Sequence, residues 1–407
     1  MATTDTFRKI CRRIPGGCST AAKSPLRNPT SCGPYFASTA SGGYFTDDEG
    51  SRWLDFDMAL SAAILGYAAP EIDEAVIQQI KKGFVFSVPS LLEAEVAERI
   101  YDRFPVAECV RFCKDGSDAT SAAVRIVRSA TGRSKIVIAS YHGWHDWSAV
   151  HYYGAHGFSP KKLGIPSSVA SDTIWLPNES FAEFKAAISS VDCIAGVMIC
   201  PENWPERDLH LLSEYCRAAN TFIIFDEIKS GVRYGPLGVS GSVAVVPDLI
   251  CLGKSIANGF PLAVLGGGSD LMSFSTDVNF STTAASEAAS LAAALAVDNH
   301  LRAVQDWPPW RVHCEGIISR LVSLVATSQP YSRLTVSGYP GNFRVHTVGC
   351  LPRNDPFRKT LLTSLTRHHI FSTGYLAPCA AHVEEDFHVL EIALAESINE
   401  WARLSPR

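Results

Sequence analysis

The sequence lacks the features of exported, membrane-spanning and nucleic-acid-binding proteins. No run approaches the roughly 18 apolar residues that cross a membrane, and the first 20 residues contain no apolar stretch of the secretory kind. A formal net charge of -5 supplies no basic field that would attract nucleic acid. We therefore expect a cytoplasmic protein that contacts neither membrane nor nucleic acid.

The cysteine pattern also favours a reducing compartment. The 12 cysteines are spread from Cys11 to Cys379 and contain no C-x-x-C pair. Several, such as Cys200 and Cys251, lie within apolar runs, as small buried thiols do in a reducing compartment.

The length and the order of apolar runs predict the fold. A chain of 407 residues, 46% of them hydrophobic, is too long for one compact domain. After Pro70, helical patterns alternate with short runs rich in Ile and Val, which predicts an α/β fold with a mostly parallel central sheet and helices on both faces. The predicted strands are 109–113, 135–139, 194–200, 221–225, 249–252 and 263–266. We expect residues 70–300 to form this large domain, with an N-terminal segment (1–69) and a C-terminal part (301–407) building a smaller α/β domain.

Helical periodicity predicts helices over 71–82 and 91–104, and a third with an apolar stripe from Ala119 to Ala130. Ser117 or Asp118 is expected to cap the third helix.

In a sheet of this kind, ligands bind beyond the carboxyl ends of the strands. Asp226 and Glu227 follow one predicted strand, and Lys254 follows the next, 28 residues after Asp226. Two neighbouring strands would then deliver a carboxylate and an amine to the same edge. Burial lowers the pKa of a lysine, which makes its free amine available for Schiff-base chemistry.

Two other strand ends carry candidate binding residues. Gly116 and Ser117 precede a helix whose first N-H groups can hold a phosphate, although the segment is neither G-x-G-x-x-G nor a P-loop. Tyr141 can stack on a planar heterocycle. His142 and His145 have the spacing of a metal pair but lack a third ligand, so we interpret them as loop or entrance residues and expect no metal.

Seven segments together resemble the class III aminotransferase family, within it the glutamate-1-semialdehyde aminomutase branch. The segments are PGG (15–17), WLDFDMALSAAILGYAAPEI (53–72), KDGSDATSAAVR (114–125), SYHGW (140–144), IIFDEIKSGVR (223–233), PDLICLGKSIANGFPLAVLGG (247–267) and FSTTAASEAASLAAA (280–294). The pairing of IIFDEIKSGVR with PDLICLGKSIANGFP at this spacing is the most specific part of the resemblance.

The resemblance implies a fold-type-I transferase that uses pyridoxal 5'-phosphate, with two residues in chemical roles. Lys254 would carry the cofactor as a Schiff base, and Asp226 would pair with the pyridine nitrogen. The cofactor would take the amino group from one substrate and pass it to a second, so the implied activity moves an amino group from an amino donor to a carbonyl acceptor.

The remaining residues implied by the resemblance surround this cofactor. Gly116 and Ser117 would hold the phosphate, and Tyr141 would stack on the ring. His142 and Glu227 are expected beside the cofactor, Glu227 in a supporting role. Thr283 would reach the phosphate of the neighbouring subunit's cofactor, which implies a homodimer with shared active sites.

Departures from the branch lie on the substrate side. Lys23 stands where the aminomutase has a carboxylate-binding arginine, Cys200-Pro201 replaces a Glu-Pro pair, and 374–381 contains no acidic residue. A lysine cannot supply the planar fork of an arginine, and the same lysine spacing resembles relatives that aminate sugars or aminocyclitols. This resemblance implies a sugar-like or secondary-metabolite carbonyl acceptor, with Thr20, Lys23 and Ser61 as candidate substrate residues. Alternative hypotheses are a 2,1-aminomutase or an amino-acid racemase or epimerase with the same cofactor, and a catalytically silent binding or regulatory protein.

Overall fold

The computed structural model describes residues 2–27, 33–155, 163–304, 310–327, 333–350 and 354–404. The chain divides into two compact units, one comprising Met1–Pro70 with Asp306–Arg407 and the other Glu71–Gln305. Among the described residues, no helix combines the length and the apolar character that crossing a membrane requires.

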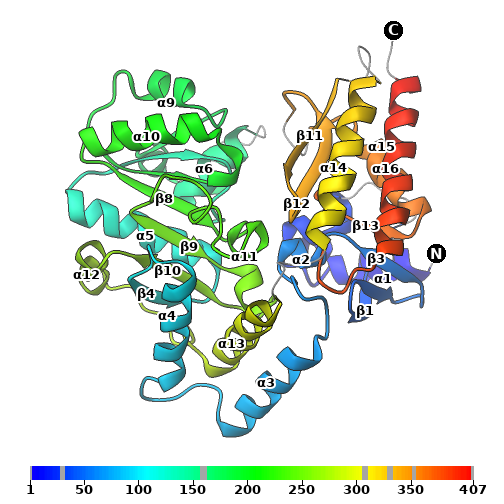
Figure 1. Ribbon diagram of the computed structural model, residues 1–407, viewed down its shortest axis with the longest axis horizontal. Helices are drawn as coiled ribbons and strands as arrows, with labels where there is room; N and C mark the ends of the chain where they lie inside the picture. Colours follow the sequence, from blue (N-terminus) through cyan, green and yellow to red (C-terminus); the bar gives the residue numbers. More distant parts are fainter. Residues whose placement is uncertain are drawn as a thin grey trace. The chain divides into compact units, whose positions relative to one another are not determined.

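The larger unit, Glu71–Gln305, is built on a seven-stranded sheet in the order β4-β10-β9-β8-β7-β5-β6 (Figure 1). Only β10 runs against its neighbours, β4 and β9; the other pairs are parallel. The predicted mostly parallel sheet is therefore confirmed. The strands are β4 (Cys109–Cys113), β5 (Lys135–Ala139), β6 (Thr173–Leu176), β7 (Ile194–Ile199), β8 (Phe222–Glu227), β9 (Leu249–Leu252) and β10 (Ala263–Gly267).

Helices cover both faces of this sheet because its central strands are apolar on both sides. On β8, Ile224 packs in the cluster that includes α5, whereas Ile223 and Phe225 pack with α9 and α10. This is the alternation of a strand buried on two faces. The helical elements of the unit are α3 (Pro70–Lys82), α4 (Leu91–Arg103), α5 (Gly116–Thr131), α6 (Asp146–Ala155), α8 (Ser167–Ser171), α9 (Phe181–Ile188), η4 (Pro201–Asn203), α10 (Glu206–Ala218), α11 (Gly231–Tyr234), η5 (Lys254–Ala257), α12 (Ser269–Asp277) and α13 (Ala288–Ala303).

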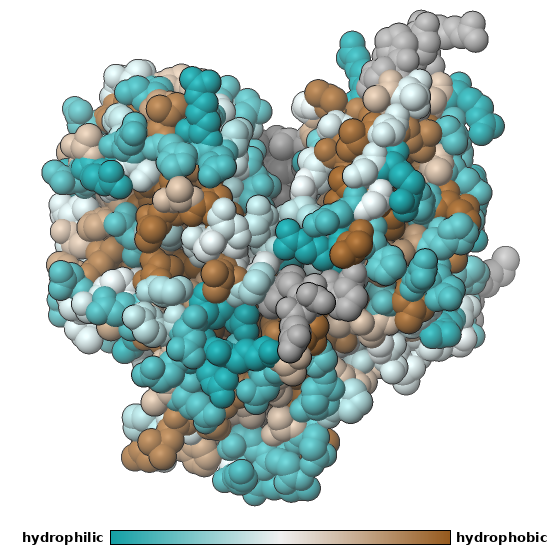
Figure 2. Space-filling model, in the orientation of Figure 1, coloured by the Kyte–Doolittle hydropathy of each residue, from teal (hydrophilic) through white to brown (hydrophobic). Residues whose placement is uncertain are grey.

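The connection between α3 and α4, residues 83–90, exposes apolar side chains together with the helix ends beside it. The exposed fraction is 48% for Phe84, 72% for Val88 and 89% for Leu91. Figure 2 shows hydrophobic colour at the surface over this connection. The backbone is nevertheless fixed to α13, because Ala288 N donates to the Phe84 carbonyl oxygen at 2.8 Å.

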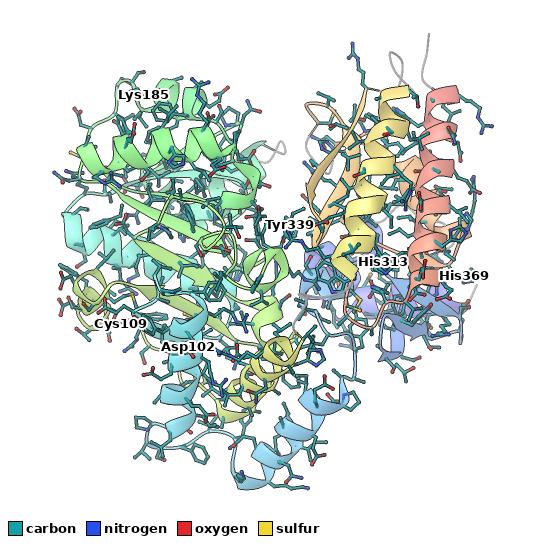
Figure 3. The ribbon with its side chains drawn as sticks, in the orientation of Figure 1. Asp102, Cys109, Lys185, His313, Tyr339 and His369 are labelled. Carbon is teal, nitrogen blue, oxygen red and sulfur yellow. The ribbon has the colours of Figure 1, made fainter. Side chains whose placement is uncertain are left out.

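Ion pairs join α4 to α13. Arg103 is 9% exposed and donates through Nη2 to Asp298 Oδ1 at 2.6 Å. Arg302 reaches Asp298 at 2.5 Å and Asp102 at 3.2 Å; Asp102 is labelled in Figure 3. Because Asp298 is shared by several guanidinium groups and largely buried, removing it would leave a buried cation without its counter-charge.

The smaller unit contains a four-stranded sheet, β1-β2-β3-β13, and a β11-β12 hairpin. Its strands are β1 (Ala37–Ser41), β2 (Tyr44–Asp47), β3 (Arg52–Asp55), β11 (Leu334–Tyr339), β12 (Asn342–Thr347) and β13 (Ile370–Phe371). Its helical elements are α1 (Ala2–Cys11), η1 (Pro15–Gly17), η2 (Ala21–Lys23), η3 (Pro25–Arg27), α2 (Met58–Ser61), α14 (Trp310–Thr327), α15 (Arg358–Arg367) and α16 (Glu384–Leu404).

Segment α2 is a left-handed turn. Met58, Ala59, Leu60 and Ser61 all have positive φ, from 47° to 70°, a conformation that costs roughly 1–2 kcal/mol for each residue with a Cβ. Buried carboxylates compensate for this cost. Asp55 Oδ1 accepts from the Asp57 and Met58 amides at 2.7 and 3.0 Å, and Asp57 accepts from the Leu60 amide at 2.6 Å.

These carboxylates predict how the stability of the protein depends on pH. Burial and the neighbouring Asp57 raise the pKa of Asp55 from 3.8 to about 7. The folded state therefore binds this proton more tightly than the unfolded chain, so the stabilisation is complete below the unfolded pKa and is lost as the pH rises through 7. We expect Asp55 alone to contribute a fall in the free energy of unfolding of up to about 1.4 kcal/mol per pH unit between its unfolded pKa of 3.8 and about 7.

Asp55→Asn should flatten that slope in urea titrations at several pH values, because the amide keeps an oxygen for the two backbone donors and cannot ionise. Asp48→Asn, at an exposed aspartate of the same unit, serves as the control. An unchanged slope in Asp55→Asn would show that Asp55 does not hold a proton in the folded state.

Candidate active site

Lys254 lies at the carboxyl edge of the sheet in the larger unit. It begins η5, two residues after the end of β9, with a φ of 50°. Its side chain is half-buried, and burial lowers the pKa of Lys254, while Asp226, Cys200 and Glu202 act in the opposite direction. The lowered pKa increases the fraction of free amine, the form that attacks a carbonyl carbon.

Asp226 comes from the neighbouring strand. β8 and β9 pair in parallel with Asp226 opposite Cys251, so the carboxylate and the amine of Lys254 leave the sheet at the same edge. Asp226 is 6% exposed. One carboxylate oxygen accepts from the Ile228 amide at 3.1 Å, and the other faces His142 Nδ1 at 2.7 Å.

His142 holds Asp226 in place. Its ring is 1% exposed, and Nε2 lies 2.5 Å from the Ala139 carbonyl oxygen. The two atoms that these ring nitrogens face, the Ala139 carbonyl oxygen and an Asp226 carboxylate oxygen, are both acceptors, and the tautomer of the ring decides which nitrogen donates. The structure thus brings His142 to Asp226 from β5, a strand two positions away in the sheet.

At Gly116 and Ser117, the start of α5 packs closely against neighbouring residues. The predicted caps, Ser117 and Asp118, were wrong: Asp115 has extended φ/ψ values and its carboxylate accepts from the Ser117 and Asp118 amides at 2.7 and 3.0 Å. Because Asp115 is the residue before the first helical turn, its side chain reaches those amides. A Cβ on Gly116 would lie 2.6 Å from Ile228 Cδ1, so this position has no room for a side chain.

The loop after β5 meets this helix start. Trp144 N donates to Ser117 Oγ at 3.3 Å, and a Cβ on Gly143 would lie 2.7 Å from that oxygen. Tyr141 lies in the same loop with 43% of its surface exposed, after Ser140, whose positive φ of 74° turns the chain. The Ser140 hydroxyl is fixed by a hydrogen bond to Glu179.

Glu227 faces a neighbouring loop. It is fully buried, and its two oxygens accept from the Val239 and Ser240 amides at 2.7 and 2.8 Å. Burial raises the pKa of Glu227 to about 7. These contacts give Glu227 the role of organising the loop after α11.

The other predicted site residues lie apart from this group in the chain. Thr283 is exposed in a turn before α13. Thr20, Lys23 and Ser61 belong to the smaller unit. Thr20 and Lys23 are exposed, whereas Ser61 is 2% exposed and its hydroxyl accepts from Asn342 Nδ2 at 2.7 Å.

Two polar residues after β7 were not predicted as site residues. The Cys200 sulfur and the nearest ligand atoms of His142 and Asp226 lie within 4.8 Å of one another, and burial raises the pKa of the Cys200 thiol. Glu202 follows in η4. The rule that ligands bind at strand ends points to both, since they follow the buried run of β7 just as Asp226 and Lys254 follow theirs.

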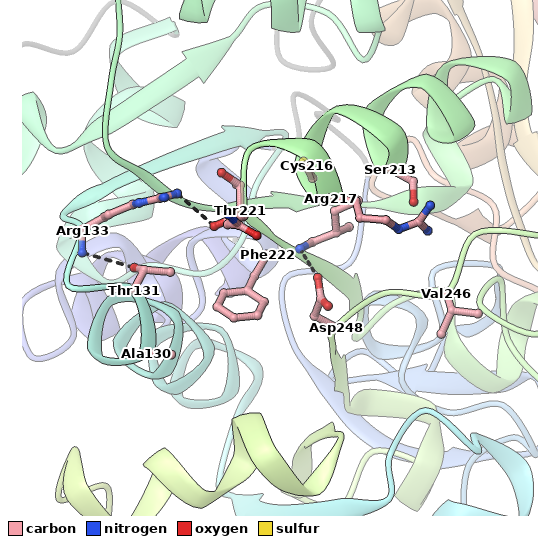
Figure 4. A pocket seen from close by; sticks show the side chains of 12 residues that line it. Ala130, Thr131, Arg133, Ser213, Cys216, Arg217, Thr221, Phe222, Val246 and Asp248 are labelled. Atoms are coloured by element: carbon pink, nitrogen blue, oxygen red, sulfur yellow. Dashed lines mark hydrogen bonds between the residues drawn. The ribbon is translucent and has the colours of Figure 1, made fainter.

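A cavity of about 390 Å³ lies at the opposite, amino-terminal edge of the sheet, where β8 begins (Figure 4). Arg133 lines this cavity, and its guanidinium group donates to the carbonyl oxygens of Ile194, Ala219 and Asn220 at 2.9–3.1 Å. Asp248 accepts from the Ile223 amide at 2.7 Å. Because these charged groups bind the backbone, the cavity is interpreted as structural, and the chemistry is assigned to the other edge.

Comparison with known proteins places this site in a family. The pattern of the family described as aminotransferase class-III matches residues 27–308. The chain is 37% identical over 286 residues to glutamate-1-semialdehyde 2,1-aminomutase of Methanothermobacter thermautotrophicus. This alignment covers 67% of this chain and 66% of that protein. It is 29% identical over 431 residues to 3-aminobutyryl-CoA aminotransferase of Cloacimonas acidaminovorans. This alignment covers 98% of this chain and 97% of that protein.

A solved omega-transaminase from Sphaerobacter thermophilus matches with a TM-score of 0.83 and 25% identity over 98% of this chain and 97% of that chain. The chain belongs to the class III aminotransferase family, so the resemblance found in the sequence is confirmed. The fold is that of the pyridoxal-phosphate-dependent transaminases, and pyridoxal 5'-phosphate is the cofactor that this family uses.

Proposed function

We propose that this protein is a pyridoxal-phosphate-dependent aminotransferase that moves an amino group from an amino donor to an aldehyde or ketone acceptor. The observation that carries the proposal is the pairing of β8 with β9, which brings the His142-bound carboxylate of Asp226 and the amine of Lys254 to one sheet edge. The pKa of Lys254 is lowered by burial. A lysine that served only a structural ion pair would not need this lowered pKa, so the shift supports a chemical role.

The residues at this edge fit the cofactor. Gly116, which has no Cβ to collide with Ile228, begins α5, and the backbone N-H groups and the helix dipole at this end of the helix favour a phosphate. The half-exposed ring of Tyr141 offers a face for stacking. When bound, the cofactor supplies an aldehyde carbon for an amine and a ring that accepts electrons.

Three side chains would then do the protein's part of the chemistry. Lys254 Nζ takes the proton from the substrate carbon and returns it, as a general base and acid with a lowered pKa. Asp226 holds a proton on the ring nitrogen, which favours electron withdrawal. His142 orients Asp226 through the 2.7 Å contact of its Nδ1 with the carboxylate.

We propose a sugar-like or secondary-metabolite carbonyl as the acceptor. The support is chemical: Lys23 and the hydroxyl-bearing Thr20 are exposed in the smaller unit, and Lys23 stands at the position where the aminomutase branch has a carboxylate-binding arginine. The relative from Methanothermobacter favours a second candidate, a 2,1-aminomutase, in which the amine returns to the molecule that supplied it.

We also propose a cytoplasmic homodimer with shared active sites. The exposed apolar side chains of the connection between α3 and α4 support it, since a surface of this kind is suited to a second copy of the chain. Thr283, exposed in its turn, would be the residue that reaches the partner's cofactor.

Single-turnover absorbance measurements test the function. We expect one amino donor, among glutamate, glutamine, alanine and amino sugars, to convert the bound cofactor stoichiometrically to its aminated form, and a carbonyl acceptor to reverse this change. Net turnover of a single amino substrate without any acceptor would instead establish the aminomutase or racemase. A purified protein whose spectrum does not change on adding the cofactor or borohydride would refute both and favour a silent binding protein.

A further inference from the structure

Glu202 lies at the same sheet edge as the candidate active site without a role in it so far. It belongs to η4, which directly follows β7, and β7 pairs in parallel with the strand of Asp226. The Cys200 sulfur, two residues earlier, is within 4.8 Å of a carboxylate oxygen of Asp226. Glu202 therefore occupies the next strand end along from Asp226 and Lys254.

One oxygen of Glu202 is incompletely satisfied. Among the described residues, no group forms a hydrogen bond with Oε2, although this atom is enclosed by protein. Leaving a buried polar atom without a partner costs about 1–3 kcal/mol, and more when the group is charged. Native proteins tolerate few such atoms, and a ligand is one reason for them.

The surroundings of Glu202 connect it to the reacting groups. Burial is the largest influence on the Glu202 carboxyl group and raises its pKa to about 7. Glu227 and Asp226 also raise this pKa, whereas Lys229 lowers it. Glu202 in turn acts on the pKa of Lys254. Glu202 therefore combines a place at the strand end beside Asp226 with an electrostatic influence on Lys254.

We propose that Glu202 is a substrate-specificity residue, which accepts through Oε2 a hydrogen bond from a hydroxyl group next to the amine-bearing carbon of the substrate. This inference rests on the proposed function, since it assumes that the amine of the substrate is joined to a cofactor at Lys254. It favours hydroxylated amines over alkyl amines of the same skeleton, because only the former supply a donor to the enclosed oxygen. Polyhydroxylated, sugar-like substrates are the class that meets this condition.

Equilibrium binding to the cofactor-free protein tests the proposal without requiring turnover. Two stable ligands are prepared by reducing pyridoxal phosphate with an amine, one from serinol and one from isopropylamine, which share a carbon skeleton and differ in their hydroxyl groups. We expect calorimetry to give a Kd about tenfold lower for the serinol ligand, the ratio that corresponds to one hydrogen bond. In Glu202→Ala this preference should disappear, and in Glu202→Gln, which keeps an acceptor oxygen, it should persist.

Glu206→Gln, at an exposed glutamate four residues further along the chain, is the matched control and should bind as the unmodified protein does. Equal Kd values for the two ligands in the unmodified protein, or an undiminished preference in Glu202→Ala, would overturn the role of Glu202. Failure of both ligands and of the cofactor itself to bind would instead overturn the proposed function, so the two failures are distinguishable.

Discussion

Lys254→Ala should abolish turnover while leaving the fold intact. Without the amine, no group at this edge is placed to take the proton from the substrate carbon, and we expect the rate of amino transfer to fall at least about 1,000-fold. The substitution removes a half-buried side chain at a position whose positive φ is as unfavourable for alanine as for lysine. Urea titration should therefore detect little change in the free energy of unfolding.

Mass spectrometry gives a second measure of the role of Lys254. After borohydride treatment, the unmodified chain should carry the mass of the reduced cofactor on the peptide that contains Lys254, and Lys254→Ala should not. Lys185→Ala is the control, because this exposed lysine lies on α9, away from the sheet edge (Figure 3). Transfer at a normal rate in Lys254→Ala would refute the assignment of the site.

Asp226→Asn should lower the catalytic rate by roughly 1,000-fold, a loss of about 4 kcal/mol of transition-state stabilisation. Asparagine is neutral, so it cannot hold a proton on the ring nitrogen through a charge, and His142 Nδ1 then faces an amide in place of a carboxylate. Binding of the cofactor should survive, because the phosphate contacts and Lys254 remain.

The absorbance of the bound cofactor distinguishes a loss of catalytic rate from a loss of cofactor binding. We expect Asp226→Asn to retain the bound chromophore and to lose the rate of its conversion by the amino donor. Asp270→Asn, at an exposed aspartate in the first turn of α12, should change neither. An Asp226→Asn rate within about tenfold of the unmodified protein would show that this carboxylate does not support the electron flow.

Periodicity was sufficient to predict most of the large sheet, but not all of it. The buried runs of β5, β7, β8 and β9 stand out because each is apolar on both faces. β6, with only four residues and polar neighbours, Thr173–Leu176, is too short to produce a period. The apolar run of β10 predicts a strand, but not that it runs against its neighbours, because direction depends on the connection from Lys254.

A site residue was predictable from the sequence where its position depends on the end of a single strand. Asp226 lies at the end of the apolar run of β8 and Lys254 two residues after β9, so the sequence indicates both. The contact of His142 with Asp226 joins residues 84 positions apart and depends on the order of β5, β7 and β8, which the sequence alone does not define. The left-handed turn at Met58 to Ser61 was also not predictable, because it contains no glycine to indicate positive φ.

The reversal of β10 bears on how firmly the amine of Lys254 is positioned. Val264 on β10 is paired with Leu252 on β9, so both ends of the link that carries Lys254 are fixed in neighbouring, wholly buried strands. Insertions in distant surface loops leave the separation of these ends unchanged. Anyone grafting this nucleophile onto another scaffold would therefore have to transplant the two strands as a single hairpin.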